Sequence, residues 1–96
     1  MSSGNFISIR LPARFDFSAH KAFTLQCDEA LNAEAIQGID VDFSLVQYLD
    51  SSALGMLVLL HRKATALQLP VILTGCQGTA LEILTMANMH KLFQVN

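Results

Sequence analysis

The sequence predicts an α/β fold in which a mixed β-sheet with largely parallel interior strands packs against α-helices. Segments with strand and helix patterns alternate along the chain, and strands joined by helical crossovers lie parallel in one sheet. Residues 38–43 alternate strictly between apolar and polar side chains, which is typical of a strand with one buried face. Residues 71–74 are almost wholly apolar, as expected of an interior strand that is covered on both faces.

The size and composition indicate one compact domain. The chain has 96 residues, of which 52% are apolar and only 15% are charged, and this excludes a disordered, solvated chain. We therefore expect a single domain over residues 1–96. The net charge is −2 and the basic residues are scattered, so no nucleic-acid partner is expected.

Neither a membrane anchor nor a signal peptide is expected. The apolar run at residues 53–60 is too short to cross a bilayer, and residues 1–5 lack the basic start and apolar stretch of a signal peptide. The sequence therefore predicts a cytoplasmic protein without direct membrane insertion.

The cysteine and histidine positions predict neither a metal site nor a cofactor. Cys27 and Cys76 lie far apart, without the close spacing of a metal or redox motif, and are expected to be free thiols. His20, His61 and His90 lack the i, i+4 spacing that would build a metal-binding helix face. We expect surface or boundary histidines.

Element boundaries follow from periodicity, capping residues and prolines. Strands are predicted at residues 6–11, 38–43, 71–74 and 93–95. Helices are predicted from Ser18, as N-cap, to about Asn32, and over residues 51–67 and 79–86. Residues 14–17 fit either a short strand or an ordered loop. The loops at 42–51 and 75–78 follow strand ends, where α/β sheets carry functional residues, and should lie near each other.

The predicted helix at residues 51–67 has two distinct faces. At 100° per residue, an apolar sector holds the residues assigned to the core, Ala53, Leu57, Leu60, Ala64 and Leu67. A second sector mixes small, aliphatic and cationic residues, namely Ser51, Gly55, Val58, Leu59 and Arg62. It fits a docking surface, but a helix buried on two sides fits the periodicity nearly as well. Gly55 fits either a close backbone contact or a glycine tolerated in a stable helix.

Asp50, Ser51 and Ser52 precede this helix and have the chemistry of an N-cap. Their side-chain oxygens can accept backbone N–H groups that the first turn leaves unpaired. One hydroxyl is then spare, and a phosphate on it would meet the positive end of the helix dipole while adding about two negative charges. A cap without regulatory role is the simpler interpretation of these three residues alone.

The segment Asp50-Ser51-Ser52-Ala53-Leu54-Gly55 resembles the Asp-Ser-Ser/Thr-Gly-Leu-Gly signature of STAS domains, particularly bacterial anti-sigma factor antagonists. The likeness extends through nearly the whole chain. Residues 14–16 resemble the family's early segment ending in Asp, residues 41–44 its strand before the signature, and residues 84–93 its closing segment. The resemblance implies a STAS-like single domain.

The resemblance implies a phosphorylation switch at Ser51, the serine directly after the signature aspartate, with Ser52 as the neighbouring alternative. Asp16 and Asp50 match acidic family positions beside the switch, and Asp42 occupies a nearby, less constant position. Local capping and solubility are the alternative roles of these three aspartates.

In this family the unmodified form binds an anti-sigma factor and so frees the sigma factor for transcription. A serine kinase switches this binding off, and a PP2C-type phosphatase restores it. The partner, an anti-sigma factor or related regulator, is expected to contact Ser51, Ala53, Leu54, Gly55, Val58, Leu59 and Arg62. Ala53 departs from the usual signature glycine, and its methyl group would fill space that a partner or kinase uses.

Two other functions are alternatives to an anti-sigma factor antagonist. In the first, the chain is a STAS subunit of a membrane-associated lipid ABC transporter complex, where the same surface binds the ATPase and phosphorylation is irrelevant. In the second, the chain is an enzyme; however, Ser51 and His61 are separated by about 15 Å of helical rise and cannot form a catalytic hydrogen bond. Residues 75–78 fit a tight turn better than an anion cradle, and no enzymatic activity is expected.

Overall fold

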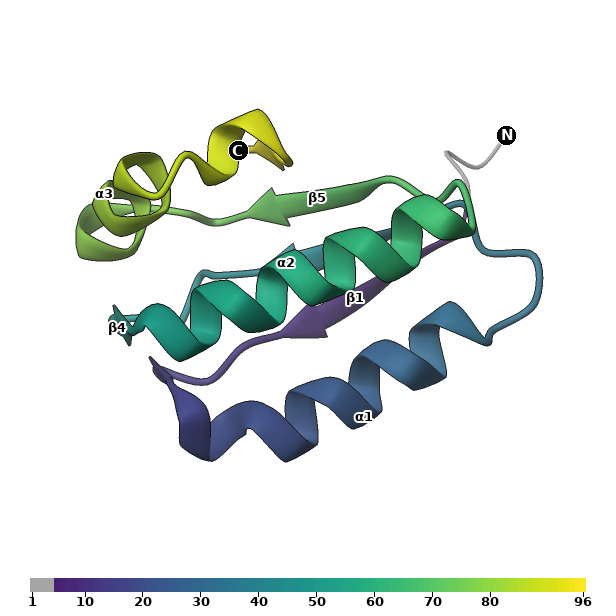
Figure 1. Cartoon of the computed structure of the whole chain (residues 1–96), viewed down its shortest axis with the longest axis horizontal. Helices are drawn as coiled ribbons and strands as arrows, with labels where there is room; N and C mark the ends of the chain where they lie inside the picture. Colours follow the sequence, from purple (N-terminus) through teal and green to yellow (C-terminus); the bar gives the residue numbers. More distant parts are fainter. Residues whose placement is uncertain (1–4) are drawn as a thin grey trace.

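The computed structural model describes residues 5–96, in which strands and helices alternate along the chain (Figure 1). The strands are β1 (Phe6–Arg10), β2 (Arg14–Phe15), β3 (Gly38–Asp42), β4 (Tyr48–Leu49), β5 (Val71–Thr74) and β6 (Gln94–Val95). The α-helices are α1 (His20–Leu31), α2 (Ser51–Ala66) and α3 (Gly78–Met86), and the short 3₁₀ helices are η1 (Phe17–Ala19) and η2 (Met89–Lys91). None of these helices is long and apolar enough to span a bilayer.

The main sheet has the strand order β1-β3-β5-β6, and β2 pairs with β4 in a separate two-stranded ribbon. The predicted parallel interior is confirmed. The other strand pairs within residues 5–96 are also parallel, so the described sheet is not mixed. The reason is connectivity, because a helix lies in the chain between each pair of neighbouring strands of the main sheet.

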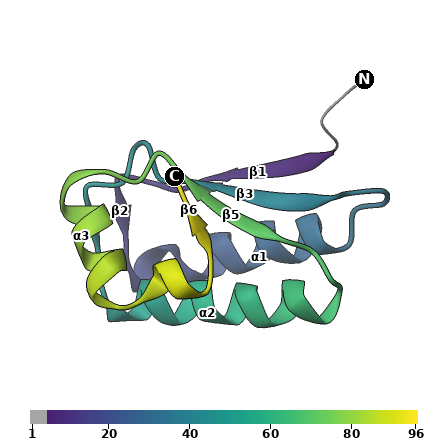
Figure 2. The same cartoon turned by 90° about the horizontal axis from the view of Figure 1, so that it is seen from above.

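Helices α1 and α2 form a layer on one face of the main sheet (Figure 2). Odd-numbered strand residues point toward this layer, and they form the core with residues of the helices and loops; the largest fully buried side chains are Leu11, Phe15, Ile39, Val41, Phe43, Leu57, Leu60, Leu73 and Leu84. The even-numbered residues point to the opposite face, where Arg10 pairs with Asp42 and the Thr74 hydroxyl donates to Asp40 at 2.6 Å. The part of this face near the carboxyl ends of the strands is thus polar.

The start of the first helix differs from its prediction. Ser18 was expected to cap it, but Asp16 caps η1, and α1 begins at His20. The Asp16 carboxylate accepts from both the backbone N–H and the hydroxyl of Ser18, so Ser18 is a donor within the first turn. The chain before η1 is the short strand β2, which was one of the two interpretations of residues 14–17.

The core face of α2 is confirmed for four of its five predicted residues. Ala53, Leu57, Leu60 and Ala64 are at most 2% exposed, but Leu67 is 54% exposed. The helix ends at Ala66, and Gln68 takes a φ of 60°, so the periodic face stops before Leu67. Helical periodicity predicts whether a residue is buried only if that residue lies within the helix.

The two loops that follow β3 and β5 lie side by side, as predicted. The Phe43 N–H donates to the Thr74 carbonyl at 2.7 Å, and a Cβ added at Gly75 would lie 2.9 Å from the Ser44 nitrogen. Gly75 has a φ of 68°, which favours glycine, and Gly78 has a φ of 57° where α3 begins.

Each of two aspartates closes a turn at the end of a strand. The Asp16 carboxylate accepts from the Ser18 N–H at 2.9 Å and from the Arg14 Nε at 2.7 Å. These contacts, led by the hydrogen bond from the Ser18 side chain and then that from Arg14, hold the pKa of Asp16 below its usual value.

Asp42 repeats this arrangement after β3. Its carboxylate accepts from the Ser44 N–H at 2.8 Å and lies 3.4 Å from the Arg10 Nε. The Ser44 backbone N–H is the main cause of a lowered pKa of Asp42, and Arg10 contributes less. Both carboxylates are therefore expected to stay charged at mildly acidic pH.

Replacing Gly75 by alanine is expected to lower the free energy of unfolding by more than about 1 kcal/mol, because the positive φ and the close Ser44 backbone oppose a methyl group. Urea denaturation measures this change. The matched control is Gly55→Ala inside α2, where an added Cβ meets no atom within 4 Å. This variant is expected to gain about 0.5–1 kcal/mol, since alanine favours the helix. Equal shifts for the two variants would contradict the assignment.

The lowered pKa values of Asp16 and Asp42 predict a pH dependence of stability. A carboxyl whose pKa is lower in the folded state stabilises fully above its unfolded pKa, and the contribution is lost as pH falls through the folded pKa. Stability is therefore expected to decrease below about pH 3.8, the ordinary aspartate value. Urea unfolding at pH steps from about 5 to about 2 should show a shallower decrease for Asp16→Asn and Asp42→Asn than for wild type. Three identical pH profiles would refute this coupling.

Candidate functional site

Helix α2 begins at Ser51 because Asp50 caps it. Asp50 is extended, with φ −118°, and its Oδ1 accepts from the Ala53 N–H at 3.0 Å while its carbonyl accepts from the Leu54 N–H. Ser51 and Ser52 are exposed, and neither hydroxyl makes a hydrogen bond within residues 5–96. The predicted N-cap is confirmed for Asp50 only. Neither serine caps the helix, so both hydroxyls are unbonded within residues 5–96, where one spare hydroxyl was predicted.

The β2–β4 ribbon places a second aspartate beside this cap. Arg14 pairs with Tyr48 and Phe15 with Leu49 in parallel register. Asp16 and Asp50 are the next residue of each strand, so both leave the ribbon at the same end. The short strand Tyr48–Leu49 was not predicted, since two residues are too few to display an alternating pattern.

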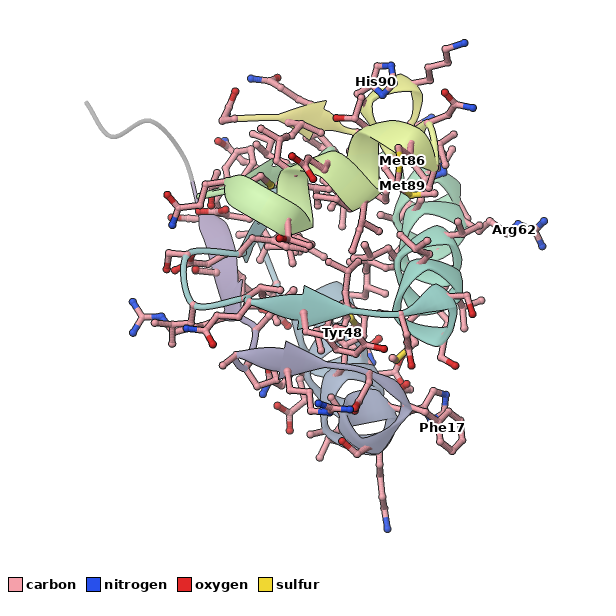
Figure 3. All side chains as sticks on the ribbon, turned by 90° about the vertical axis from the view of Figure 1, so that its left-hand side faces the viewer. Phe17, Tyr48, Arg62, Met86, Met89 and His90 are labelled. Atoms are coloured by element: carbon pink, nitrogen blue, oxygen red, sulfur yellow. The ribbon has the colours of Figure 1, made fainter. Side chains whose placement is uncertain are left out.

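Arg14 is held within this ribbon. Its Nε pairs with Asp16, and its guanidinium lies 4.8 Å from the centre of the Tyr48 ring, which is 43% exposed. Figure 3 shows Tyr48 near the middle of this end of the molecule. The cation nearest to the cap along the ribbon is therefore already shared between an acid and an aromatic ring.

Asp42 lies apart from Asp16 and Asp50. It ends β3, and its carboxylate contacts Arg10 and Ser44 on the polar face of the sheet. Helix α2 lies on the opposite face (Figure 2). The structure thus joins two of the three predicted acidic neighbours to the start of α2 and does not bring Asp42 to the same side.

The exposed face of α2 contains most of the second predicted sector. Gly55 and Arg62 are exposed, Leu59 is 45% exposed, and Val58 is partly buried against the core. Arg62 projects away from the body of the protein in Figure 3. The alternative of a helix buried on two sides is wrong, because this face has no covering element among residues 5–96.

Two residues of the predicted partner surface are placed differently. Ala53 is fully buried, so its methyl group packs in the core and takes no space from a partner or kinase. Leu54 is partly buried and packs against the core. Gly55 has no neighbouring backbone, since an added Cβ would meet nothing within 4 Å.

Exposed apolar side chains flank the start of α2 and were not predicted. Phe17 is 68% exposed and stacks on His20 at a ring distance of 5.4 Å, and Met86, at the end of α3, is 78% exposed. In Figures 1 and 3, α2 lies between the segments that carry these two residues. A strand over residues 14–17 would have put Phe17 on the same face as the buried Phe15, but the turn at Asp16 directs it outward.

The grouping of Asp50, Ser51 and His61 does not assemble. His61 lies ten residues beyond Ser51 on the same helix, and its ring packs edge-on against Phe93 at 5.3 Å. Among residues 5–96 there is also no group of three His, Cys, Asp or Glu side chains placed to hold a metal ion.

The electrostatic surroundings of Ser51 are acidic rather than basic. Asp50 adjoins it, and the Arg14 guanidinium is engaged with Asp16. Arg62, the next basic residue along α2, is about 16 Å away by helical rise. A phosphate on Ser51 would therefore meet the helix N-terminus without a basic side chain from its own helix beside it.

The STAS domain family model matches residues 2–96. A STAS-domain-containing protein of Pseudomonas aeruginosa (strain UCBPP-PA14) is 35% identical over 97 residues, covering 99% of this chain and 92% of that protein.

Solved structures share the fold at lower identity. The anti-sigma factor antagonist SpoIIAA in its unphosphorylated form matches with a TM-score of 0.72 at 21% identity, covering 100% of this chain and 83% of that one. Bacillus SpoIIAA in its phosphorylated form matches with a TM-score of 0.72 at 20% identity, covering 100% of this chain and 86% of that one. A sulfate transporter family protein from Wolinella succinogenes matches with a TM-score of 0.81 at 13% identity, covering 94% of this chain and 75% of that one. The family match over residues 2–96, the relative at 35% identity and the shared fold show that the chain belongs to the STAS domain family.

Proposed function

We propose that this chain is an anti-sigma factor antagonist, a protein-binding module that phosphorylation of Ser51 switches off. The unphosphorylated form sequesters an anti-sigma factor or related regulator, and the phosphorylated form releases it, which regulates transcription. The observation that carries the proposal is the free, exposed hydroxyl of Ser51 at a capped helix start, directly beside an exposed face. The module acts in the cytoplasm by binding and carries out no catalysis itself.

The binding surface is the exposed face of α2, defined by Ser51, Gly55, Val58, Leu59 and Arg62. Gly55 leaves a gap that an opposing side chain can enter, because no atom of the protein lies within 4 Å of its missing Cβ. Leu59 supplies an apolar contact, and Arg62 supplies a cation at the far end. Exposed apolar area rimmed by polar groups is typical of protein interfaces.

The switch acts through desolvation of charge. A phosphate dianion on Ser51 is compatible with the free protein, since it faces the positive end of α2 and solvent. A docked partner would have to remove water from this dianion beside Asp50, while the nearby Arg14 is already paired with Asp16. Burying unpaired charge costs several kcal/mol, and each 1.4 kcal/mol changes affinity about tenfold.

A local effect is sufficient, and no refolding is required. Asp50 holds the first turn of α2 through the Ala53 N–H, whether or not its neighbour carries phosphate. Both the unphosphorylated and the phosphorylated form of SpoIIAA share the fold of this chain, which supports a switch that needs no change of fold. The exposure of Ser51 gives access to a serine kinase and to a PP2C-type phosphatase.

The switch is tested by charge at Ser51. Pull-down from the native cells with unphosphorylated protein identifies the partner, and calorimetry then compares wild type, Ser51→Ala and Ser51→Asp. Wild type and Ser51→Ala are expected to bind within about threefold, and Ser51→Asp at least about tenfold more weakly, with the phosphorylated protein weakest. Equal affinities for all these forms would remove the switch. Recovery of a transporter ATPase, with no phosphorylated form in cells, would support the transporter subunit instead.

Substitutions of two exposed leucines, one on α2 and one directly after it, test the proposed binding surface. Leu59 lies on the proposed surface and is 45% exposed, whereas Leu67 follows the last turn of α2 and is 54% exposed. Leu59→Asp is expected to weaken partner binding at least about tenfold, because it places an unpaired charge in the interface. Leu67→Asp, the matched control, should leave affinity unchanged, and both variants should retain the unfolding midpoint. Similar losses for both, or none for Leu59→Asp, would contradict this surface.

A further inference from the structure

Strand β1 is an edge of the main sheet, and its outer backbone groups have no strand partner among residues 5–96. The Leu11 N–H donates to the Asp42 carbonyl, and the Asn5 carbonyl accepts from the Gln37 N–H, so odd-numbered residues bond toward β3. Because alternate residues of a strand bond to opposite sides, the N–H and C=O groups of Phe6, Ser8 and Arg10 point outward. The strand order places no described strand beyond this edge.

An apolar groove runs along this edge between β1 and α1. One part, of about 260 Å³, lies between Ile7, Ser8 and Ile9 of β1 and the Gln26–Ala30 region of α1. A second part, of about 390 Å³, continues past Arg10, Leu11 and Pro12 toward the start of α1. The two parts share Gln26 as a lining residue, so both lie along the same stretch between β1 and α1.

The position of α1 determines what fits in this groove. In Figure 1, α1 lies beyond the β1 edge, and in Figure 2 it lies on the helix side of the sheet, so it overhangs the edge. A second copy paired edge to edge in the antiparallel direction would bring its own α1 to the same face of the sheet, into the space that this overhang occupies. A single extended segment brings no helix, and its inward side chains would rest on α1.

The charges along the groove specify the segment further. Glu29 is exposed on the α1 side and makes no ion pair among residues 5–96, where the pairs are Arg10–Asp42, Arg14–Asp16 and Lys63–Asp28. A basic side chain of the segment would pair with Glu29. The apolar floor, formed by Ile7, Ile9 and Ala30, requires apolar side chains at the other inward positions.

We infer that the outer edge of β1 binds an extended segment of a partner protein as an additional β-strand. The segment has apolar side chains at alternate positions and one basic residue opposite Glu29. Main-chain hydrogen bonds to Phe6, Ser8 and Arg10 provide the binding, and the groove selects the side chains. This site is separate from the exposed face of α2, so a segment can bind here whether or not Ser51 carries phosphate.

Hydrogen exchange of single backbone amides, measured by NMR, tests the pairing of each residue of β1. In the free protein, the amides of Ile7, Ile9 and Leu11 are expected to exchange slowly and those of Ser8 and Arg10 quickly. The probes are the peptides acetyl-Thr-Lys-Thr-Val-Thr-Val-Thr-amide and acetyl-Thr-Val-Thr-Val-Thr-Lys-Thr-amide, which place the lysine at opposite ends for parallel and antiparallel addition. Binding of either peptide should slow the exchange of Ser8 and Arg10 selectively.

A matched pair of variants separates the backbone from the side chain. Ser8→Pro removes the outward N–H, while Ser8→Ala removes only the hydroxyl, and proline is tolerated at a sheet edge. Peptide affinity should be unchanged in Ser8→Ala and at least tenfold weaker in Ser8→Pro, with the unfolding midpoint showing that both are folded. Glu29→Lys should weaken both peptides, and replacing the peptide lysine by glutamate should restore binding to that variant. Ser51→Asp should bind the peptides as wild type does.

Three results would overturn the inference. The first is the absence of peptide binding to the wild type at millimolar concentration. The second is equal affinity of Ser8→Pro and Ser8→Ala for the peptides. The third is protection of the Ser8 and Arg10 amides that rises with protein concentration alone, since it would assign the edge to a second copy of this chain.

Discussion

The hydrogen bond from the Ala53 N–H to the Asp50 carboxylate fixes where α2 begins, and the surface around Ser51 depends on it. Asp50 uses one oxygen for the cap, and this leaves the two following hydroxyls unbonded and exposed. Ala53, which donates this bond, lies on the core face of α2, and its methyl group is completely buried. A single capping interaction therefore separates the side chain that a modifying enzyme can reach from the side chain that anchors the helix.

The β2–β4 ribbon also holds the start of α2 in place. Its parallel register brings the segment before α1 next to the segment before α2, so that two helix starts and two capping aspartates share one end of the molecule. Arg14 pairs with Asp16 through its Nε and lies over the Tyr48 ring. The start of α2 therefore has local acidity and a helix dipole, and the cation beside it is shared with an acid and an aromatic ring.

The molecule presents two surfaces of different chemistry. The exposed face of α2 offers side chains: a gap at Gly55, the apolar Leu59 and the cation Arg62. The outer edge of β1 offers backbone groups above an apolar groove. We propose that binding to the first responds to charge at Ser51 and that binding to the second depends on the geometry of the strand. A small domain can in this way contact two partners without using the same atoms for both.

The sequence predicted those features that arise within a single helix or strand. The alternation of residues 38–43, the apolar run at β5, the cap before α2 and the core face from Ala53 to Ala64 all arise from short-range periodicity or from side chains that bond their own backbone. Tertiary structure alone decided the features that join distant segments: the β2–β4 pairing that sets Asp16 beside Asp50, the separation of Asp42, the outward turn of Phe17 and the overhang of α1 beyond β1. Two-residue strands and turns leave too few residues for a period, and their positions follow from packing between elements that lie far apart in the chain.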